Sequence, residues 1–121
     1  MKKLVIIDGK SVFYRGYYAM PTSGVYGFAV IAMEIVRNIQ PDQVVVAWDK
    51  AHTSTAKRLA IFKDYKAGRV RPPEDFYAQI PLLRELISAL SWGFMEADEY
   101  EADDIIGTLA RQADEAGDYM T

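Results

Sequence analysis

The sequence contains no cysteine and a single histidine, His52. These absences exclude a disulfide framework, a thiolate zinc site, a cysteine nucleophile and a metal centre built from several histidines. Long apolar runs are also missing, because the run that starts at Leu4 stops at Asp8. That is short of the roughly 7 to 15 residues of a signal peptide and the roughly 18 of a membrane span. We therefore expect a soluble, cytoplasmic protein with no membrane partner.

What the sequence does contain is typical of a folded domain. Its 121 residues are 50% hydrophobic and 26% charged, which is the composition of a globular protein rather than a disordered tail. Domains usually run to roughly 50 to 250 residues, so the chain is one domain or part of one.

Charge is distributed unevenly along the chain. The formal net charge is -3, which argues against a uniformly basic binder of histone type. Residues 57–71 nevertheless hold many cations and a single acid, whereas residues 96–104 hold many acids and no cation. The cations are Lys57, Arg58, Lys63, Lys66, Arg69 and Arg71, and the acids are Glu96, Asp98, Glu99, Glu101, Asp103 and Asp104.

The hydrophobic pattern predicts an α/β fold with a mainly parallel central sheet flanked by helices. Residues 4–7 and 44–48 are short, uninterrupted apolar runs, which is typical of strands buried on both faces. Between them, apolar residues recur every three or four positions and predict a helix over 25–39. Strand, helix and strand in this order form a βαβ unit with a right-handed crossover.

Further elements follow from local signals. We expect a short helix over 11–19, a helix that starts at 72–75 and is kinked or restarted at Pro81, and a weak strand over 93–95. A last helix should run from Ala102 to about Ala116 and close at Gly117. Only four residues follow Gly117, where the next strand should begin, so we expect a domain truncated at its C-terminus.

Each of the first two predicted strands ends in an aspartate, Asp8 and Asp49. Ligands of open α/β sheets bind outside the carboxyl ends of the strands, so both carboxylates should lie at the functional edge. Either aspartate alone could instead cap or turn the chain.

A third acidic group, Glu101, Asp103 and Asp104, stands at the start of the last predicted helix. Acids in a first turn stabilise a helix by about 0.3 to 1 kcal/mol each, which explains one or two acids but not so dense a cluster. Crowded carboxylates need protons or cations to neutralise them, and oxygen-only ligands suit Mg²⁺ or Mn²⁺. Two such ions stabilise the attacking and leaving oxygens in phosphodiester hydrolysis. The predicted metal-binding carboxylates are Asp8, Asp49, Glu101, Asp103 and Asp104.

The basic stretch complements these carboxylates. Its cations, Lys57, Arg58, Lys63, Lys66, Arg69 and Arg71, with Tyr65 among them, could grip a phosphate backbone and stack on unpaired bases. Lys66 and Arg69 could also stabilise charge on a transferring phosphate. On the first predicted helix, Arg15 is a candidate phosphate contact and Tyr14 a candidate base-stacking residue. A solvated helix face for the cations and a core position for Tyr14 are the alternatives.

Several motifs in this order resemble the N-terminal half of the bacterial 5′-nuclease domain, the flap endonuclease-like 5′-3′ exonuclease of DNA polymerase I proteins. The resemblance runs through most of the chain. Its motifs are Asp8-Gly9 with Tyr14-Arg15, Val25-Tyr26-Gly27-Phe28, Trp48-Asp49, Tyr65-Lys66-Ala67-Gly68-Arg69, Pro73-Glu74-Asp75 and Tyr100-Glu101-Ala102-Asp103-Asp104-Ile105-Ile106-Gly107.

The resemblance implies a PIN-like (resolvase-like) nuclease that cleaves DNA at 5′ single-stranded ends or flaps, with a two-metal Mg²⁺ or Mn²⁺ site on the five carboxylates. It implies that Arg58, Lys66 and Arg69 belong to a helical arch over about residues 50–73, with Tyr65 beside them, and that Arg15 lies near the cleaved phosphate. It also implies a nucleoid-associated role in bacterial DNA replication and repair.

On this resemblance, residues 1–121 are the N-terminal part of the catalytic domain, and the family's C-terminal DNA-binding region is absent. We therefore expect reduced or no activity from the chain alone. An unpaired strand edge could also drive self-association.

Two other functions stay open at this point. One is a nucleic-acid-binding module without catalysis, in which the loss of Asp8 or Asp49 would leave DNA affinity unchanged or improved. The other is a phosphotransfer or phosphatase domain with a strand-end aspartate as nucleophile, which gives no reason for the basic stretch.

Overall fold

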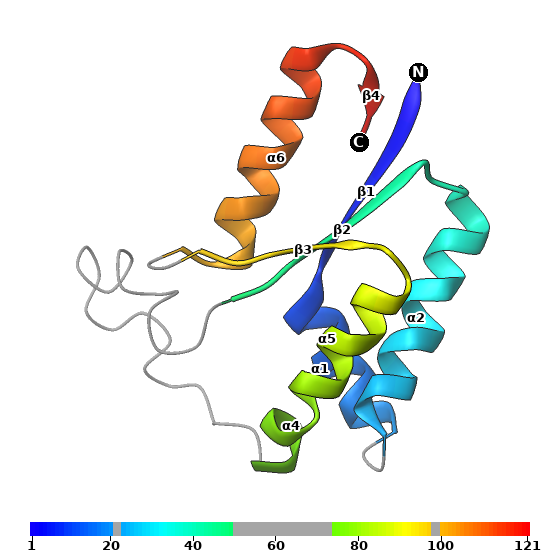
Figure 1. Ribbon diagram of the computed structural model, residues 1–121, viewed down its shortest axis with the longest axis vertical. Helices are drawn as coiled ribbons and strands as arrows, with labels where there is room; N and C mark the ends of the chain where they lie inside the picture. The colour runs from blue at the N-terminus through cyan, green and yellow to red at the C-terminus, as the bar shows by residue number, and fades with distance from the viewer. Residues whose placement is uncertain (21–22, 50–73, 98–99) are drawn as a thin grey trace.

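The computed structural model of this chain describes residues 1–20, 23–49, 74–97 and 100–121. In these ranges strands and helices alternate along much of the chain (Figure 1). The elements are β1 (Lys2–Asp8), α1 (Gly9–Ala19), α2 (Gly24–Ile39), β2 (Gln43–Ala47), α4 (Glu74–Ala78), α5 (Ile80–Ala89), β3 (Gly93–Met95), α6 (Ala102–Ala116) and β4 (Tyr119–Met120).

The described strands form one sheet in the order β3-β2-β1-β4, and every pairing is parallel. In its register, Val5 lies beside Val44 and Ile7 beside Val46. Because side chains alternate between the two faces of a strand, these residues share one face. The α/β class with a parallel central sheet is therefore confirmed.

Helices cover both faces of the sheet (Figure 1), with α6 on one side and α1, α2, α4 and α5 on the other. The main hydrophobic core lies on the side of the four helices. Its largest fully buried side chains are Phe13, Phe28, Phe76, Leu83, Ile87 and Val46.

Helices α1 and α2 touch backbone to backbone at two glycines. A Cβ atom added to Gly16 would lie 2.5 Å from the backbone nitrogen of Phe28 and 2.6 Å from the carbonyl carbon of Gly27. Such distances leave no room for a side chain, so this crossing requires glycine.

Polar contacts attach α4 and the α4–α5 junction to the first two helices. The Tyr17 hydroxyl donates to Asp75, at 2.7 and 2.8 Å from its two carboxylate oxygens. The backbone nitrogen of Gly24 donates to Gln79 Oε1 at 2.6 Å. Between these two contacts, Phe76 is fully buried against Phe13, with their ring centroids 4.9 Å apart.

The elements predicted from the hydrophobic pattern within the described residues are present, with small shifts at their ends. Helix α1 begins at Gly9 rather than Ser11, because Asp8 caps it. The helix expected from 72–75 is split into α4 and α5, and Pro81 lies in the first turn of α5. Gly117 closes α6 with φ 79°. Strand β4 stands where a further strand was expected to begin.

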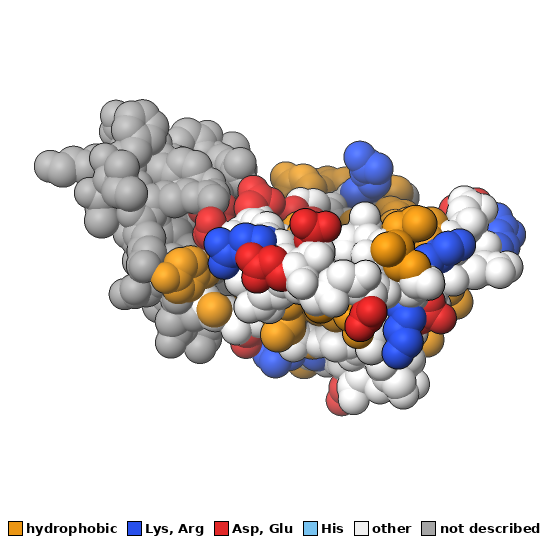
Figure 2. All heavy atoms as spheres, turned by 90° about the horizontal axis from the view of Figure 1, so that it is seen from above, with side chains coloured by type: hydrophobic (Ala, Val, Ile, Leu, Met, Phe, Trp, Pro, Cys, Tyr) orange, Lys and Arg blue, Asp and Glu red, His pale blue; other side chains and the backbone are white. Residues whose placement is uncertain are grey.

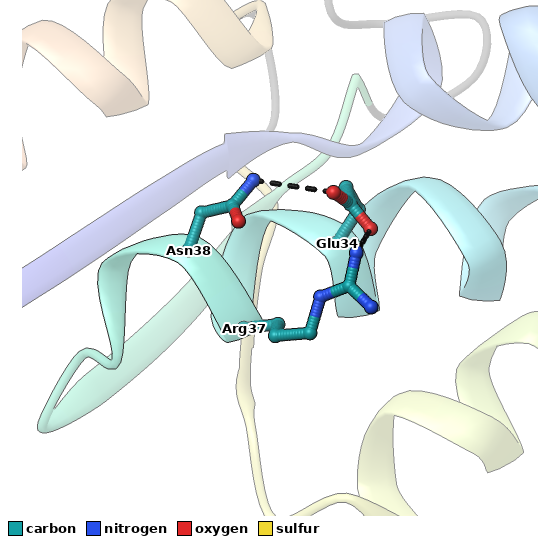
Figure 3. A network of polar contacts seen from close by, with 3 residues as sticks. All are labelled: Glu34, Arg37 and Asn38. Atoms are coloured by element: carbon teal, nitrogen blue, oxygen red, sulfur yellow. Dashed lines mark hydrogen bonds and ion pairs between the residues drawn. The ribbon is translucent and has the colours of Figure 1, made fainter.

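The face of the molecule that is seen from above mixes charge types among its described residues (Figure 2). In the view from above, acidic and basic side chains are interspersed with hydrophobic ones (Figure 2). On the exposed side of α2, Arg37 donates to Glu34, and Asn38 Nδ2 donates to Glu34 Oε1 at 3.3 Å (Figure 3). The hydrogen bond from Arg37 lowers the pKa of Glu34. Exposed pairs of this kind contribute little to stability.

No single helix in the described ranges is long and apolar enough to cross a membrane. Helices α1 and α2 together have the length and apolar composition of a membrane span, but they are bent by 118° relative to each other.

Candidate functional site

The ends of β1, β2 and β3 form one edge of the sheet, which we call the strand-end edge. Asp8 is the last residue of β1 and pairs in register with Ala47, the last residue of β2. Asp49 follows two residues after Ala47. The aspartates predicted to share an edge thus extend from neighbouring strands, as parallel pairing requires.

Both carboxylate oxygens of Asp8 are engaged by one residue at the start of α1. Oδ1 accepts from the backbone nitrogen of Ser11 at 3.3 Å, and Oδ2 accepts from the Ser11 hydroxyl at 2.8 Å. This is an N-cap, so the capping role considered for Asp8 is real and coexists with its place at the edge. Ser11 was not among the predicted site residues, although an Asp-x-x-Ser spacing at a helix start would have indicated it.

Asp49 attaches the end of β2 to the start of α6. Its Oδ1 accepts from the backbone nitrogen of Ala102 at 2.5 Å. In the same turn, Asp104 Oδ2 accepts from the backbone nitrogen of Glu101 at 2.9 Å, which forms a capping box. Glu101 is only 4% exposed, whereas Asp103 is exposed. The structure therefore brings Asp49, Glu101 and Asp104 to one helix terminus.

The positive ends of two helices add to the electrostatics of this edge. Asp8 caps the N-terminus of α1, and Asp49 bonds the N-terminus of α6. Unpaired backbone N–H groups at helix N-termini favour negative charge. They partly offset the repulsion between the carboxylates.

The donor chemistry of these residues fits a hard divalent cation, because every candidate ligand is a carboxylate oxygen. The positions of these side chains do not by themselves form a metal site. Across residues 1–20, 23–49, 74–97 and 100–121, no group of three or more acidic or histidine side chains is arranged to hold a metal ion. Metal binding by the five carboxylates stays a prediction.

Two predicted nucleic-acid contacts lie on α1. Arg15 is exposed, and Tyr14 is 45% exposed. The Tyr14 ring centroid is 4.6 Å from that of Tyr18 and 5.8 Å from that of Phe76, so Tyr14 lies at the rim of the core. The hydrogen bond with Tyr14 raises the pKa of Tyr18.

The remaining predicted contacts fall in the basic stretch. Residues 50–73 lie outside the described part of the chain. These contacts are Lys57, Arg58, Lys63, Tyr65, Lys66, Arg69 and Arg71.

Comparison with known proteins identifies the family of this chain. The family described as "5'-3' exonuclease, N-terminal resolvase-like domain" matches residues 3–121. The chain belongs to this family. The resemblance inferred from the sequence motifs is confirmed.

Curated relatives of this exonuclease family match nearly the whole chain. The chain is 42% identical over 125 residues to DNA polymerase I of Bacillus subtilis (strain 168), which covers 96% of the chain. It is 44% identical over 124 residues to DNA polymerase I of Geobacillus stearothermophilus, which covers 95% of it. In both cases the chain spans only 14% of the relative's own length.

A solved structure shares the fold. The T5 D15 protein, co-crystallized with metal ions, superposes with a TM-score of 0.64 at 16% sequence identity. The match covers 91% of this chain and 44% of that one.

Proposed function

We propose that this chain is the N-terminal part of the catalytic domain of a metal-dependent 5′-3′ exonuclease or flap endonuclease, which hydrolyses DNA phosphodiester bonds at 5′ ends or flaps. Membership of the exonuclease family supports the nuclease class. The observation that carries the proposal is the hydrogen bond from Ala102 to Asp49, which joins an aspartate to an acidic helix start 53 positions away. Asp8 extends from the neighbouring strand.

We propose that Asp8, Asp49, Glu101, Asp103 and Asp104 would hold the divalent cations, Mg²⁺ or Mn²⁺. Such ions supply positive charge that stabilises the attacking and leaving oxygens of phosphodiester hydrolysis. The chain's own groups orient these carboxylates. Ser11 fixes both oxygens of Asp8, and the backbone nitrogen of Ala102 fixes one oxygen of Asp49.

Cations and aromatic rings would handle the DNA strand. Arg15, which is exposed on α1, would bind a phosphate, and Tyr14, which is 45% exposed, would stack on an unpaired base. In the basic stretch over residues 57–71, Lys66 and Arg69 would stabilise the transferring phosphate, while other residues would bind the single strand. These other residues are Lys57, Arg58, Lys63, Tyr65 and Arg71. The protein would act on the bacterial chromosome, in replication and repair.

The test is a chimera in which these 121 residues replace the matching segment of Bacillus subtilis DNA polymerase I. We expect it to cleave a 5′ flap with Mg²⁺ or Mn²⁺. Asp8→Asn and Asp49→Asn should each reduce the cleavage rate by at least about 10²-fold, the scale for loss of one preorganised electrostatic group, while DNA affinity persists. Asp118→Asn, next to β4 and away from the strand-end edge, is the matched control and should cleave normally. Cleavage unaffected by Asp8→Asn would contradict the proposal.

The 121-residue chain alone should bind Mg²⁺ or Mn²⁺ weakly and turn over little substrate. Fast flap cleavage by this chain alone would refute that expectation.

A nucleic-acid-binding module without catalysis is the second candidate. The observation that favours it is that, among the described residues, no three acidic side chains are arranged so that they could hold a metal ion. It predicts a chimera that binds flap DNA but does not cleave it, with affinity unchanged or increased by Asp49→Asn.

A further inference from the structure

Trp48 stands between β2 and Asp49 in the chain and is 5% exposed. Its backbone nitrogen donates to the carbonyl oxygen of Met95, the last residue of β3, at 2.8 Å. The residue that precedes Asp49 is therefore tied to two strands of the sheet.

The indole ring also lies against the backbone next to Asp8. A Cβ atom added to Gly9 would lie 2.7 Å from Trp48 Cε3 and 2.5 Å from Val46 Cγ1. Gly9 directly follows Asp8 and begins α1. The indole of Trp48 thus lies against the residue that follows Asp8, and the backbone of Trp48 is joined by a peptide bond to Asp49.

Aromatic neighbours hold this ring in place. Phe94 is stacked on Trp48 with centroids 5.9 Å apart and an interplanar angle of 29°. Phe13 lies 6.1 Å away at 47°. The guanidinium carbon of Arg84 lies 4.5 Å from the centre of the Phe94 ring and covers it. A ring packed in this way has few alternative positions.

We infer that Trp48 is a positioning residue, whose indole sets the separation between the Asp8 and Asp49 carboxylates for binding a divalent cation. This inference rests on the proposed nuclease function. The carboxylate of Asp49 accepts a hydrogen bond from the backbone nitrogen of Ala102. A displaced indole would therefore change the place of Asp49 relative both to Asp8 and to the acidic start of α6.

The sequence offers a matched control, because it contains only two tryptophans. Trp92 is half-buried, packs against the same core and lies just before β3, away from either aspartate. Trp48→Phe and Trp92→Phe remove the same atoms. A purely structural role would make the two variants differ in stability alone.

Mn²⁺ binding to the 121-residue chain distinguishes a positioning role of Trp48 from a purely structural one. Free Mn²⁺ is measured by electron paramagnetic resonance. We expect Trp48→Phe to weaken Mn²⁺ binding by about 10- to 100-fold, the usual effect of losing a group that orients metal ligands. Trp92→Phe should retain the affinity of the unmodified chain. Equal affinity in the two variants would overturn the inference.

A fluorescence measurement does not depend on whether Trp48→Phe folds. The Trp92→Phe chain has Trp48 as its sole tryptophan, so Mn²⁺ bound between Asp8 and Asp49 should quench its emission. Adding Asp8→Asn to this chain should abolish the quenching. No quenching by Mn²⁺ that is demonstrably bound would overturn the inference.

The chimera distinguishes this inference from the proposed function. With Trp48→Phe we expect a lower kcat for flap cleavage and little change in KM. If Trp48→Phe and Trp92→Phe cleave alike while Asp8→Asn is inactive, only the positioning role is wrong. If the unmodified chain binds no Mn²⁺ and the unmodified chimera cleaves no flap, the proposed function is wrong and the inference is overturned with it.

Discussion

At the residue scale, the hydrogen bond between Tyr17 and Asp75 makes the stability of the fold depend on pH in the alkaline range. The bond to Asp75 is the main cause that raises the pKa of Tyr17 from 10.0 to about 12. A raised pKa means that folding favours the protonated phenol. The stabilisation is therefore complete below pH 10 and is lost as the pH rises through about 12.

Tyr17→Phe removes this hydrogen bond and the pH dependence that comes with it. We expect the variant to be less stable than the unmodified chain near neutral pH, and the difference should shrink between pH 10 and 12. The measurement is the urea midpoint of unfolding as a function of pH. Tyr26→Phe is the control, because Tyr26 is 58% exposed. A difference that stays constant over this pH window would disprove the assigned role.

Individual residues also show which parts of the candidate site could be predicted from the sequence alone. Asp8 and Asp49 were predicted at one edge because strand ends are visible in a hydrophobic pattern. The partner of Asp49 was not predictable, since Ala102 lies 53 positions away and reaches it only when α6 docks. The Ser11 cap was predictable from its spacing to Asp8, because capping is local.

At the scale of elements, the sequence predicted which helices and strands form, and in what order, better than it predicted where each one begins and ends. Strands β1 and β2 follow from short, uninterrupted apolar runs and helix α2 from apolar periodicity, and tertiary packing reinforces both signals. The break at Gln79 between α4 and α5 lies two residues before Pro81, where a kink or restart was predicted, but the contact that Gln79 makes is visible in no local pattern. Gln79 Oε1 accepts from the backbone of Gly24, which comes 55 positions earlier.

The crossing of α1 and α2 predicts opposite effects for two glycine substitutions. In Gly27→Ala, the new Cβ would lie 2.7 Å from the Cα and carbonyl carbon of Gly16, and backbone atoms cannot move aside cheaply. We expect a loss of about 1 to 3 kcal/mol or more in the free energy of unfolding. Gly107→Ala, at an exposed position of α6 with nothing within 4 Å of the added Cβ, should raise the free energy of unfolding by about 0.5 to 1 kcal/mol.

Urea unfolding of both variants tests this prediction. Matching gains in the two variants would show that helix propensity rather than the crossing decides the outcome. A neutral Gly27→Ala would show that the helices can separate at little cost.

At the scale of the whole molecule, the two sides of the sheet are packed unequally. The side of α1, α2, α4 and α5 holds the buried aromatic and aliphatic cluster. On α6, the buried residues are Ala102 and Ala113, while Ile105, Ile106 and Leu109 are only half-buried. The acidic helix start at the candidate site thus belongs to the less buried layer.

This asymmetry predicts where the molecule opens first. Local opening has the lowest free energy where few apolar side chains are buried. Amide protons of α6 should therefore exchange through a partial opening, at a lower free energy than those of β1, β2 and α2. Because Asp49 holds the start of α6 through Ala102, Asp49→Ala should speed exchange in α6 and leave α2 unchanged. Native-state hydrogen exchange followed by NMR measures both effects. Exchange of α6 and α2 at one common free energy, in both chains, would mean that the sheet and its two layers unfold as a single unit.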